Sequence, residues 1–529
     1  MSVLSSSSVI SLPSKTFVTN HHERHDFNLE LLTGFIPTTV ISADNEAFSF
    51  RVDDVFDNYF LEIVILIRAS LVATELSALF SQYLCSIGVK RVGFVVDRSL
   101  AASKKLLDGP YFSSNEGLFR LWKLFPDSQS AFVASLYMNA SIPEAAPNLA
   151  IAVPSQLYYP PSANKHLNGL RVTIKDNINI ARVKTFTSSK AYGELYGSVS
   201  QSAPAIQRLL DLGVVIVGKT GMSQFADAED PTGDCVDFHA PWNPRGDGLR
   251  SPGGSSFAGR SVRVPAASQS VYGFRPSRGT VSIDSVVLIH NDLDIIGVLS
   301  RNYHVLELVS QHLFHTTPSI IEDHAEDTRP TLIYPTHLFP IEDKAAQNMY
   351  DKTVSALKNT VEREEGQYHE KATFRAEYQA KFGRQPYVNP LAQLRWINRA
   401  RMQPEHFKRF IDGIFGSRSF MVTPFKFGEP EARDIFRLAP AERVRKEFSW
   451  GMRPAFQSPM AGQPEIVFPV SQLPVFSQAS HVKEKYGVIA SLLGSRDMDM
   501  EILETVKSQA YKNQFYAGSC LNITQAGPS

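Results

Sequence analysis

Ser202–Thr220 (SAPAIQRLLDLGVVIVGKT) joins a helix to a buried strand, and this step decides the fold class. Pro204 suits the first turn of a helix, and Ser202 stands where a capping residue is expected. Gly213 is placed to end that helix, after which Val214–Val217 is apolar enough for a strand covered on both faces. The apolar face of the helix is formed by Ile206, Leu209 and Leu210.

Helix-like and strand-like segments alternate again on both sides of this step. Strands are expected at residues 171–175, 331–334, 466–470 and 488–493, and a helix over residues 345–362. This alternation predicts an α/β fold, in which helices cover both faces of a layered, mixed, largely parallel sheet.

A proline-rich stretch divides the chain. Residues 139–163 contain Pro143, Pro147, Pro154, Pro160 and Pro161, and repeated prolines disfavour regular structure. We interpret this stretch as a linker or an extended wrap between a smaller N-terminal α+β domain (residues 1–138) and a larger domain (residues 164–529). The residues of the N-terminal domain do not indicate its function. Residues 92–96 indicate a strand within it.

Composition excludes several classes of function. Lys+Arg and Asp+Glu balance at 53 each, so no broad charge favours nucleic acid or an anionic membrane. The three cysteines are far apart, which fits a reducing compartment and neither a disulfide framework nor a metal site. Residues 1–17 lack the features of a signal peptide, and the apolar run 63–67 is too short to span a bilayer. We therefore expect a cytoplasmic protein of unknown oligomeric state.

Two segments carry possible hydrolytic chemistry. Lys175 ends an apolar strand, and Gly253–Ser256 is a Gly-Gly-Ser-Ser turn followed by a further serine, Ser261. Amide cleavage needs a nucleophile, a base and donors for the oxyanion. A lysine can act as the base only when burial keeps it neutral, and partial burial of Lys175 is plausible at a strand end.

Simpler interpretations stand beside this one. A lysine at a strand end is usually solvated, and a Gly-Gly-Ser-Ser turn is usually a loop. Arg263, on an expected strand over Val262–Val264, is most simply an exposed or ion-paired residue. Residues 254–261 also imitate a phosphate-binding loop, but its lysine is absent and Pro265 opposes the long helix that such a loop begins.

Taken together, residues 169–301 resemble the amidase signature family, and the layout with an additional N-terminal domain resembles fungal amidases. The fold that this implies is the amidase signature fold. The resemblance rests on these segments: Val172–Ile178 (VTIKDNI), Leu209–Thr220 (LLDLGVVIVGKT), Trp242–Pro244 (WNP), Ser251–Ser256 (SPGGSS), Gly259–Ala267 (GRSVRVPAA), Gly273–Gly279 (GFRPSRG) and Leu293–Gly297 (LDIIG).

The resemblance implies that Lys175 is the base, Ser261 the acyl-forming nucleophile and Ser255 the serine that relays the proton between them. It implies hydrolysis of a small or aryl amide to an acid and ammonia or an amine, without a cofactor. Further residues are implied to support the oxyanion (Gly254, Ser256, Gly259 and Arg260) and to line the substrate pocket (Phe225 and Ala226).

The chain departs from the family between the two serines. Ser255 and Ser261 are six positions apart, whereas the family places a helix, a returning strand and an Asp-x-Gly-Gly lead-in between them. Either a coding segment has been removed as though it were an intron, or the chain is a degenerate relative that only binds a ligand or partner through the same cleft. A nucleotide-binding module is a third interpretation, which would show magnesium-dependent affinity for a nucleotide.

Overall fold

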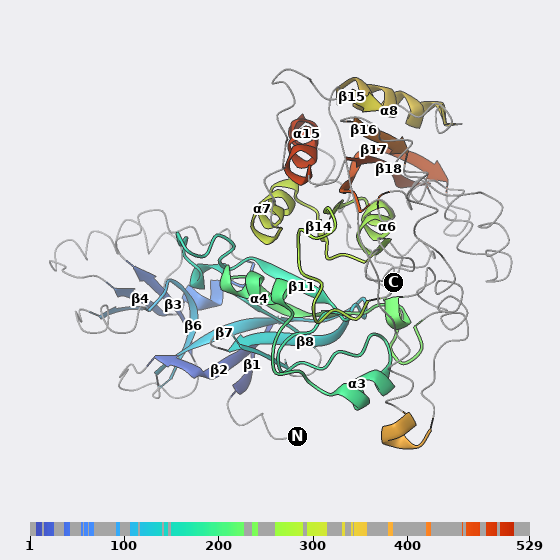
Figure 1. The fold of residues 1–529 in the computed structure, drawn as a ribbon. Coiled ribbons are helices and arrows are strands. Elements are labelled where there is room, and N and C mark those ends of the chain that lie inside the picture. The colour runs from blue at the N-terminus through green and yellow to red at the C-terminus, as the bar shows by residue number, and fades with distance from the viewer. Residues whose placement is uncertain are drawn as a thin grey trace. The chain divides into compact units, whose positions relative to one another are not determined.

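The computed structural model divides into two compact units, which are described separately (Figure 1). Unit 1 comprises residues 1–128, 132–174 and 209–220, and unit 2 comprises residues 129–131, 175–208 and 221–529. The residues that the structure describes are 7–12, 15–25, 36–42, 54–56, 58–61, 63–67, 91–95, 106–114, 117–139, 142–145, 150–226, 235–241, 260–288, 294–314, 331–333, 340–341, 343–356, 379–384, 419–424, 458, 462–476, 483–494 and 498–512.

Unit 1 contains an eight-stranded sheet in the order β1-β2-β7-β6-β3-β4-β5, with β10 paired to β7. Its strands β3, β4 and β5 run parallel to one another, and the other pairs are antiparallel. The bounds are β1 Ser7–Leu12, β2 Lys15–His25, β3 Ile36–Ser42, β4 Ile63–Ile67, β5 Arg91–Val95, β6 Gly109–Ser114, β7 Gly117–Phe125 and β10 Ile151–Pro154. The strand expected at residues 92–96 corresponds to β5.

Apolar clusters lie on both faces of this sheet. Successive side chains of a strand point to opposite sides, so neighbouring residues belong to different clusters. Phe17 and Leu121 belong to one apolar cluster, and their neighbours Val18 and Trp122 belong to another. The ring of Phe17 meets that of Phe60 edge-on, with centroids 5.4 Å apart. Such edge-to-face packing is a favoured geometry for buried aromatic rings.

The proline-rich stretch 139–163 contains regular structure, although its composition disfavours it. It forms β9 (Ile142–Ala145), β10 and the 3-10 helix η6 (Gln156–Tyr158). β9 pairs with β8 (Phe132–Asn139), and β10 pairs with β7. Pro143 and Pro154 lie within these strands, where a proline is tolerated at positions whose N–H the ladder does not need. The limits of the domains themselves stay a prediction.

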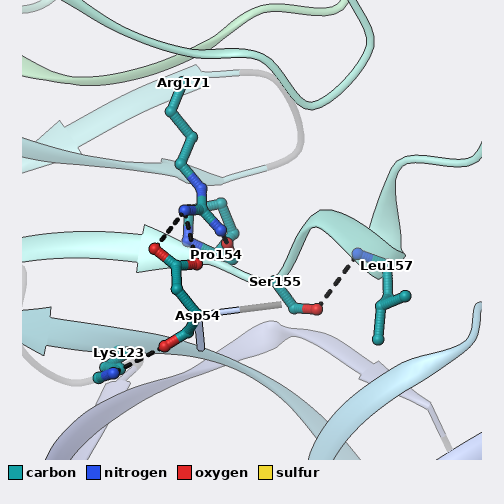
Figure 2. Close-up of polar contacts among 6 residues, drawn as sticks. All are labelled: Asp54, Lys123, Pro154, Ser155, Leu157 and Arg171. Carbon is teal, nitrogen blue, oxygen red and sulfur yellow. Dashed lines mark hydrogen bonds and ion pairs between the residues drawn. The ribbon is translucent and has the colours of Figure 1, made fainter. Parts of the chain in front are cut away.

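A second sheet has the order β11-β12-β8-β9. Polar contacts join its strand β11 (Arg171–Lys175) to the segments that carry Asp54 and Pro154 (Figure 2). The Nη1 atom of Arg171 donates to both carboxylate oxygens of Asp54 at 2.7 and 2.9 Å, and Nη2 donates to the carbonyl of Pro154 at 2.8 Å. Lys123 donates to the carbonyl of Asp54 at 2.7 Å, so three segments meet at one aspartate.

The predicted helix–strand step is present as α4 (Pro204–Asp211) and β12 (Val215–Thr220). Pro204 is the first residue of α4, and Gly213 follows the end of α4 with a φ of 93°. Ser202 does not cap it: the carbonyl of Ala203 accepts from Ile206 and Gln207, and the Ser202 hydroxyl accepts the N–H of Ala181. The sequence does not show that a second segment competes for this hydroxyl.

Unit 2 contains a six-stranded sheet in the order β14-β13-β17-β18-β16-β15. The prediction of a largely parallel sheet was wrong here, because among its described strands β15–β16 is parallel and the other neighbouring pairs are antiparallel. β17 and β18 pair along nearly their whole length as an antiparallel ladder, which needs no crossover helix. The bounds are β13 Tyr272–Arg275, β14 Val298–Ser300, β15 Thr331–Ile333, β16 Ser419–Pro424, β17 Glu465–Phe476 and β18 Lys483–Leu493.

Helices lie on both faces of this sheet, as predicted, and the sheet with its helices makes a mixed α/β unit (Figure 1). Gly273 of β13 faces Ala266 of α6, while Tyr272, its neighbour, packs its ring on Tyr303 of α7 with centroids 5.5 Å apart. The helices described in this part of unit 2 include α3 Lys190–Tyr196, α6 Arg260–Gln269, α7 Tyr303–Leu313, α8 Lys344–Ala356 and α15 Asp499–Lys512, with the 3-10 helix η7 at Gln224–Ala226.

Candidate active site

Of the three predicted catalytic residues, Lys175 is the one whose backbone and side chain the structure describes. It lies at the end of β11 and is partly buried. This burial lowers the pKa of Lys175 from 10.5 to about 8, against the opposing effect of the Asp294 carboxylate. At neutral pH, about one molecule in ten therefore holds a neutral amine at this position. The predicted partial burial of Lys175 is confirmed.

The chain that follows Lys175 is fixed by hydrogen bonds. Asp176 is fully buried, and its carboxylate accepts the N–H of Phe186 at 3.2 Å. Asn177 pairs with Val287: its carbonyl accepts the Val287 N–H at 2.7 Å, and its side-chain amide donates to the Val287 carbonyl at 3.1 Å. These bonds tie the two residues after Lys175 to the nearby loop of Phe186 and to the loop of Val287, which is 110 residues further along the chain than Asn177.

Two loops in this unit contain pairs of residues with left-handed backbone. Thr187 and Ser188 have φ of 52° and 57°, and Phe225 and Ala226 have φ of 55° and 59°. The N–H of Phe225 donates to the carbonyl of Thr187 at 2.9 Å, which ties the two pairs together. Left-handed residues other than glycine are costly and gather at functional sites.

Phe225 and Ala226, the predicted pocket residues, are buried at 2% and 3% exposure. The side chain of Phe225 packs against helix α3 and Val287, and its ring meets that of Tyr192 with centroids 6.1 Å apart. Ser189 caps α3 by accepting the N–H of Tyr192 at 3.3 Å. The structure thus gives Phe225 an aromatic packing role, and a role in binding substrate stays a prediction.

The segment after the serine turn is helical, so the strand predicted over Val262–Val264 was wrong. Helix α6 begins at Arg260 and places Ser261 in its first turn, with Pro265 inside the helix. Packing overrides the β propensity of the two valines, because Ala266 and Ala267 bury against Val467 and Ile489 of the sheet. The objection that Pro265 opposes a helix here also fails, and the missing lysine alone argues against a phosphate-binding loop.

Several predicted site residues cannot be placed against Lys175. Gly254, Ser255, Ser256 and Gly259 lie outside the described residues, and Arg260 and Ser261 are described through their backbone. Their catalytic roles stay predictions. Asp294, whose charge acts on Lys175, and Asp176, the next residue in the chain, were given no role from the sequence; each stood within a quoted family segment, which was the one available signal.

Comparison with known proteins finds a match to one protein family. A family model described as Amidase matches residues 136–257 and 258–336. The two matched pieces meet between Phe257 and Ala258, inside the short interval that separates Ser255 from Ser261. Residues 136–336 are therefore similar to the amidase family.

The chain is similar to a subunit of the glutamyl-tRNA(Gln) amidotransferase of Sulfolobus acidocaldarius, with 34% identity over 167 residues, which are 28% of this chain and 34% of that protein. It is also similar to amidase 1 of Oryza sativa subsp. japonica, with 30% identity over 189 residues, which are 32% of this chain and 43% of that protein. The matches therefore span less than half the length of these relatives.

Among solved structures, an allophanate hydrolase from Kluyveromyces lactis has 16% identity and a TM-score of 0.48, covering 73% of this chain and 67% of that one. Within the part of the chain that the structure describes, no helix has both the length and the apolar character to cross a bilayer. The same part of the chain contains no cluster of three or more His, Cys, Asp or Glu residues suited to a metal.

Proposed function

We propose that this chain hydrolyses the C–N bond of a small or aryl amide through an acyl-enzyme. The neutral amine of Lys175 takes a proton, through Ser255, from the hydroxyl of Ser261. The Ser261 oxygen then forms an ester with the acyl group, the C–N bond breaks, and the proton leaves on the departing ammonia or amine. Water releases the acid and restores Ser261. No cofactor enters these steps.

The observation that carries this proposal is the state of Lys175. A lysine with its ordinary pKa is a poor base at neutral pH, whereas burial lowers the pKa of Lys175 to about 8. The family match of residues 136–336 supports the same conclusion. The placement of Ser261 in the first turn of α6 adds favourable electrostatics, since the N-terminus of a helix stabilises negative charge.

A second candidate is a degenerate relative that binds a ligand or partner without hydrolysing it. It is favoured by the six positions between Ser255 and Ser261, where the family places a helix and a strand. The family match is interrupted within this same interval. We further propose that the protein is cytoplasmic, and that it resembles fungal amidases with an additional N-terminal domain.

Labelling by a fluorophosphonate probe separates the two candidates. The hydrolase is expected to be labelled on Ser261, and labelling is expected to disappear in both Ser261→Ala and Lys175→Met. The site of modification would be read by peptide mass spectrometry. Unlabelled protein, or labelling that persists in both variants, would contradict the enzyme and favour the binding protein.

A further inference from the structure

A buried ion pair lies directly behind the first turn of α6, in unit 2. Arg263, two positions after Ser261, has no exposed surface, and Glu465 at the start of β17 is 1% exposed. The Nη1 atom of Arg263 donates to Oε2 of Glu465. Arginine and glutamate are almost never fully buried unless they are paired, and here each is the partner of the other.

The carboxylate of Glu465 is held from three directions. Besides Arg263, the hydroxyl of Ser458 donates to its Oε2, and the hydroxyl of Ser491 on β18 donates to its Oε1. These bonds satisfy acceptors that burial would otherwise leave without water. Glu465 therefore connects α6 to the β17–β18 hairpin through a directional contact.

Buried positive charge surrounds this carboxylate. Arg275 on β13 is also fully buried, and burial together with the charge of Arg263 lowers the pKa of Arg275 to about 9. Burial lowers the pKa of Arg263 as well, and Glu465 opposes that effect. Neutralising Glu465 would leave Arg263 without its carboxylate partner and Arg275 with Asp499 as the remaining opposing charge, so the buried positive charge would be less well compensated.

Small side chains make a further part of the α6 contact with the sheet. Ala266 and Ala267 pack on Val467 and Ile489, and Gly273 lets the helix approach so closely that an added Cβ would lie 2.5 Å from the Cβ of Ala266. Small apolar surfaces bring a helix close without fixing its rotation or its position along its axis. A buried ion pair with defined partners can supply that register.

We propose that Arg263 and Glu465 are positioning residues, which hold the first turn of α6, and the backbone of Ser261 within it, at one place on the six-stranded sheet. This inference rests on the proposed function for its catalytic consequence. Its structural part, the fixed register of α6, can be tested without any activity.

The principal variant is Glu465→Gln, which keeps the size and two hydrogen-bonding groups of the side chain but removes its charge. We expect the second-order rate of fluorophosphonate labelling at Ser261 to fall tenfold or more. We also expect amide hydrogen exchange in residues 260–264 to become at least tenfold faster. Arg263→Lys, which keeps the charge but loses the planar guanidinium, is expected to lie between Glu465→Gln and the unmodified protein.

The matched control is Glu307→Gln. The side chain of Glu307 on α7 is 9% exposed and pairs with Lys507 of α15 at 2.9 Å. Glu307→Gln therefore removes the charge of a largely buried carboxylate between two other helices of the same unit. This variant is expected to lower the melting temperature while leaving labelling and exchange in residues 260–264 unchanged. Equal effects of Glu465→Gln and Glu307→Gln on both readouts would overturn the inference.

The two readouts also separate this inference from the proposed function. If the unmodified protein shows no labelling at Ser261, the proposed function fails, and hydrogen exchange alone decides whether the ion pair fixes α6. If Glu465→Gln does not fold, Arg263→Lys against the same control decides it. Unchanged exchange in residues 260–264 of Arg263→Lys would then count against the inference.

Discussion

The burial of Lys175 is expected to lower the free energy of unfolding at neutral pH. Its pKa in the folded protein, about 8, is below the ordinary value of 10.5, so between these pH values the unfolded chain binds the proton more strongly. The charged form therefore destabilises the folded protein fully below pH 8, and the effect is lost as the pH rises toward 10.5. Lys175→Met is expected to stabilise the protein at pH 7 by roughly 1–3 kcal/mol while abolishing labelling of Ser261.

Urea unfolding at pH 7 and at pH 10 would measure this effect. The gain from Lys175→Met should shrink at the higher pH, whereas Lys165→Met, which replaces an exposed lysine, should give little change at either pH. A gain that did not depend on pH would show that apolar packing, and not the loss of a charge, explains the stabilisation.

At the scale of single residues, the sequence predicts what depends on neighbours along the chain. The partial burial of Lys175 follows from its place at the end of an apolar strand, and the structure confirms it. Asp294, which opposes the effect of that burial, comes from a segment more than a hundred residues away. A carboxylate brought close by the tertiary fold leaves no local pattern in the sequence.

The approach of α6 to β13 is expected to make Gly273 intolerant of a side chain. An added Cβ would lie 2.5 Å from the Cβ of Ala266 and 3.0 Å from the carbonyl oxygen of Val262, closer than real Cβ atoms come. Gly273→Ala is therefore expected to destabilise the protein by about 1–3 kcal/mol, because the helix must move away from the sheet. Thermal unfolding followed by circular dichroism would measure the loss.

The control is Gly197→Ala at the end of α3. Gly197 has a φ of 68° and a ψ of −151°, a combination that glycine alone adopts readily, and nothing lies within 4 Å of an added Cβ. Gly197→Ala is therefore expected to cost about 1–3 kcal/mol through backbone strain, without a steric clash. If Gly273→Ala proved to cause no measurable loss of stability, α6 would not be held as closely to β13 as the structure shows. Only Gly273→Ala should also slow labelling of Ser261.

In unit 1, Arg171 is expected to matter more than its partner Asp54. Asp54 is 59% exposed, and an exposed ion pair contributes about 0–1 kcal/mol, so Asp54→Asn should have little effect on unfolding by urea. Arg171→Met also removes the donor to the Pro154 carbonyl (Figure 2), and is expected to cost about 1 kcal/mol more. Equal losses of unfolding free energy in Asp54→Asn and Arg171→Met would mean that the ion pair accounts for the whole effect and the hydrogen bond to Pro154 for none of it.

Elements were predicted well where one local pattern dominates. Helix α4, Gly213 and strand β12 follow from helical spacing, a positive φ and an apolar run. The prediction failed at Val262–Val264, because β-branched residues favour a strand only where tertiary packing allows one. In α6 the packing of Ala266 and Ala267 on the sheet, which the sequence does not reveal, decides in favour of the helix.

The arrangement of strands in the whole molecule is the level that the sequence predicts least. Alternating helices and strands gave the mixed α/β character, but not the antiparallel pairing of β17 with β18 or the contribution of β9 and β10 to sheets. The order of strands in a sheet depends on contacts between distant segments, and a proline-rich composition does not exclude the edge positions that β9 and β10 can occupy.

The interval between the two serines leads to a prediction about the gene. The family model matches on both sides of Phe257–Ala258, and α6 and the Lys175 loop keep defined structure around it. Loss of a buried helix and strand would expose apolar surface and unpaired backbone groups, at a cost comparable to the roughly 5–15 kcal/mol that stabilise a domain.

We therefore expect transcripts that carry an additional in-frame segment between Gly254 and Ser261, and sequencing of the transcript across this region would detect it. Protein made from the longer transcript should label at Ser261 faster than this chain and unfold at a higher temperature, because the added elements would cover the exposed surface. Lys175→Met should abolish labelling in the longer form as well. An uninterrupted transcript that matches this sequence would eliminate the splicing explanation and leave the degenerate relative.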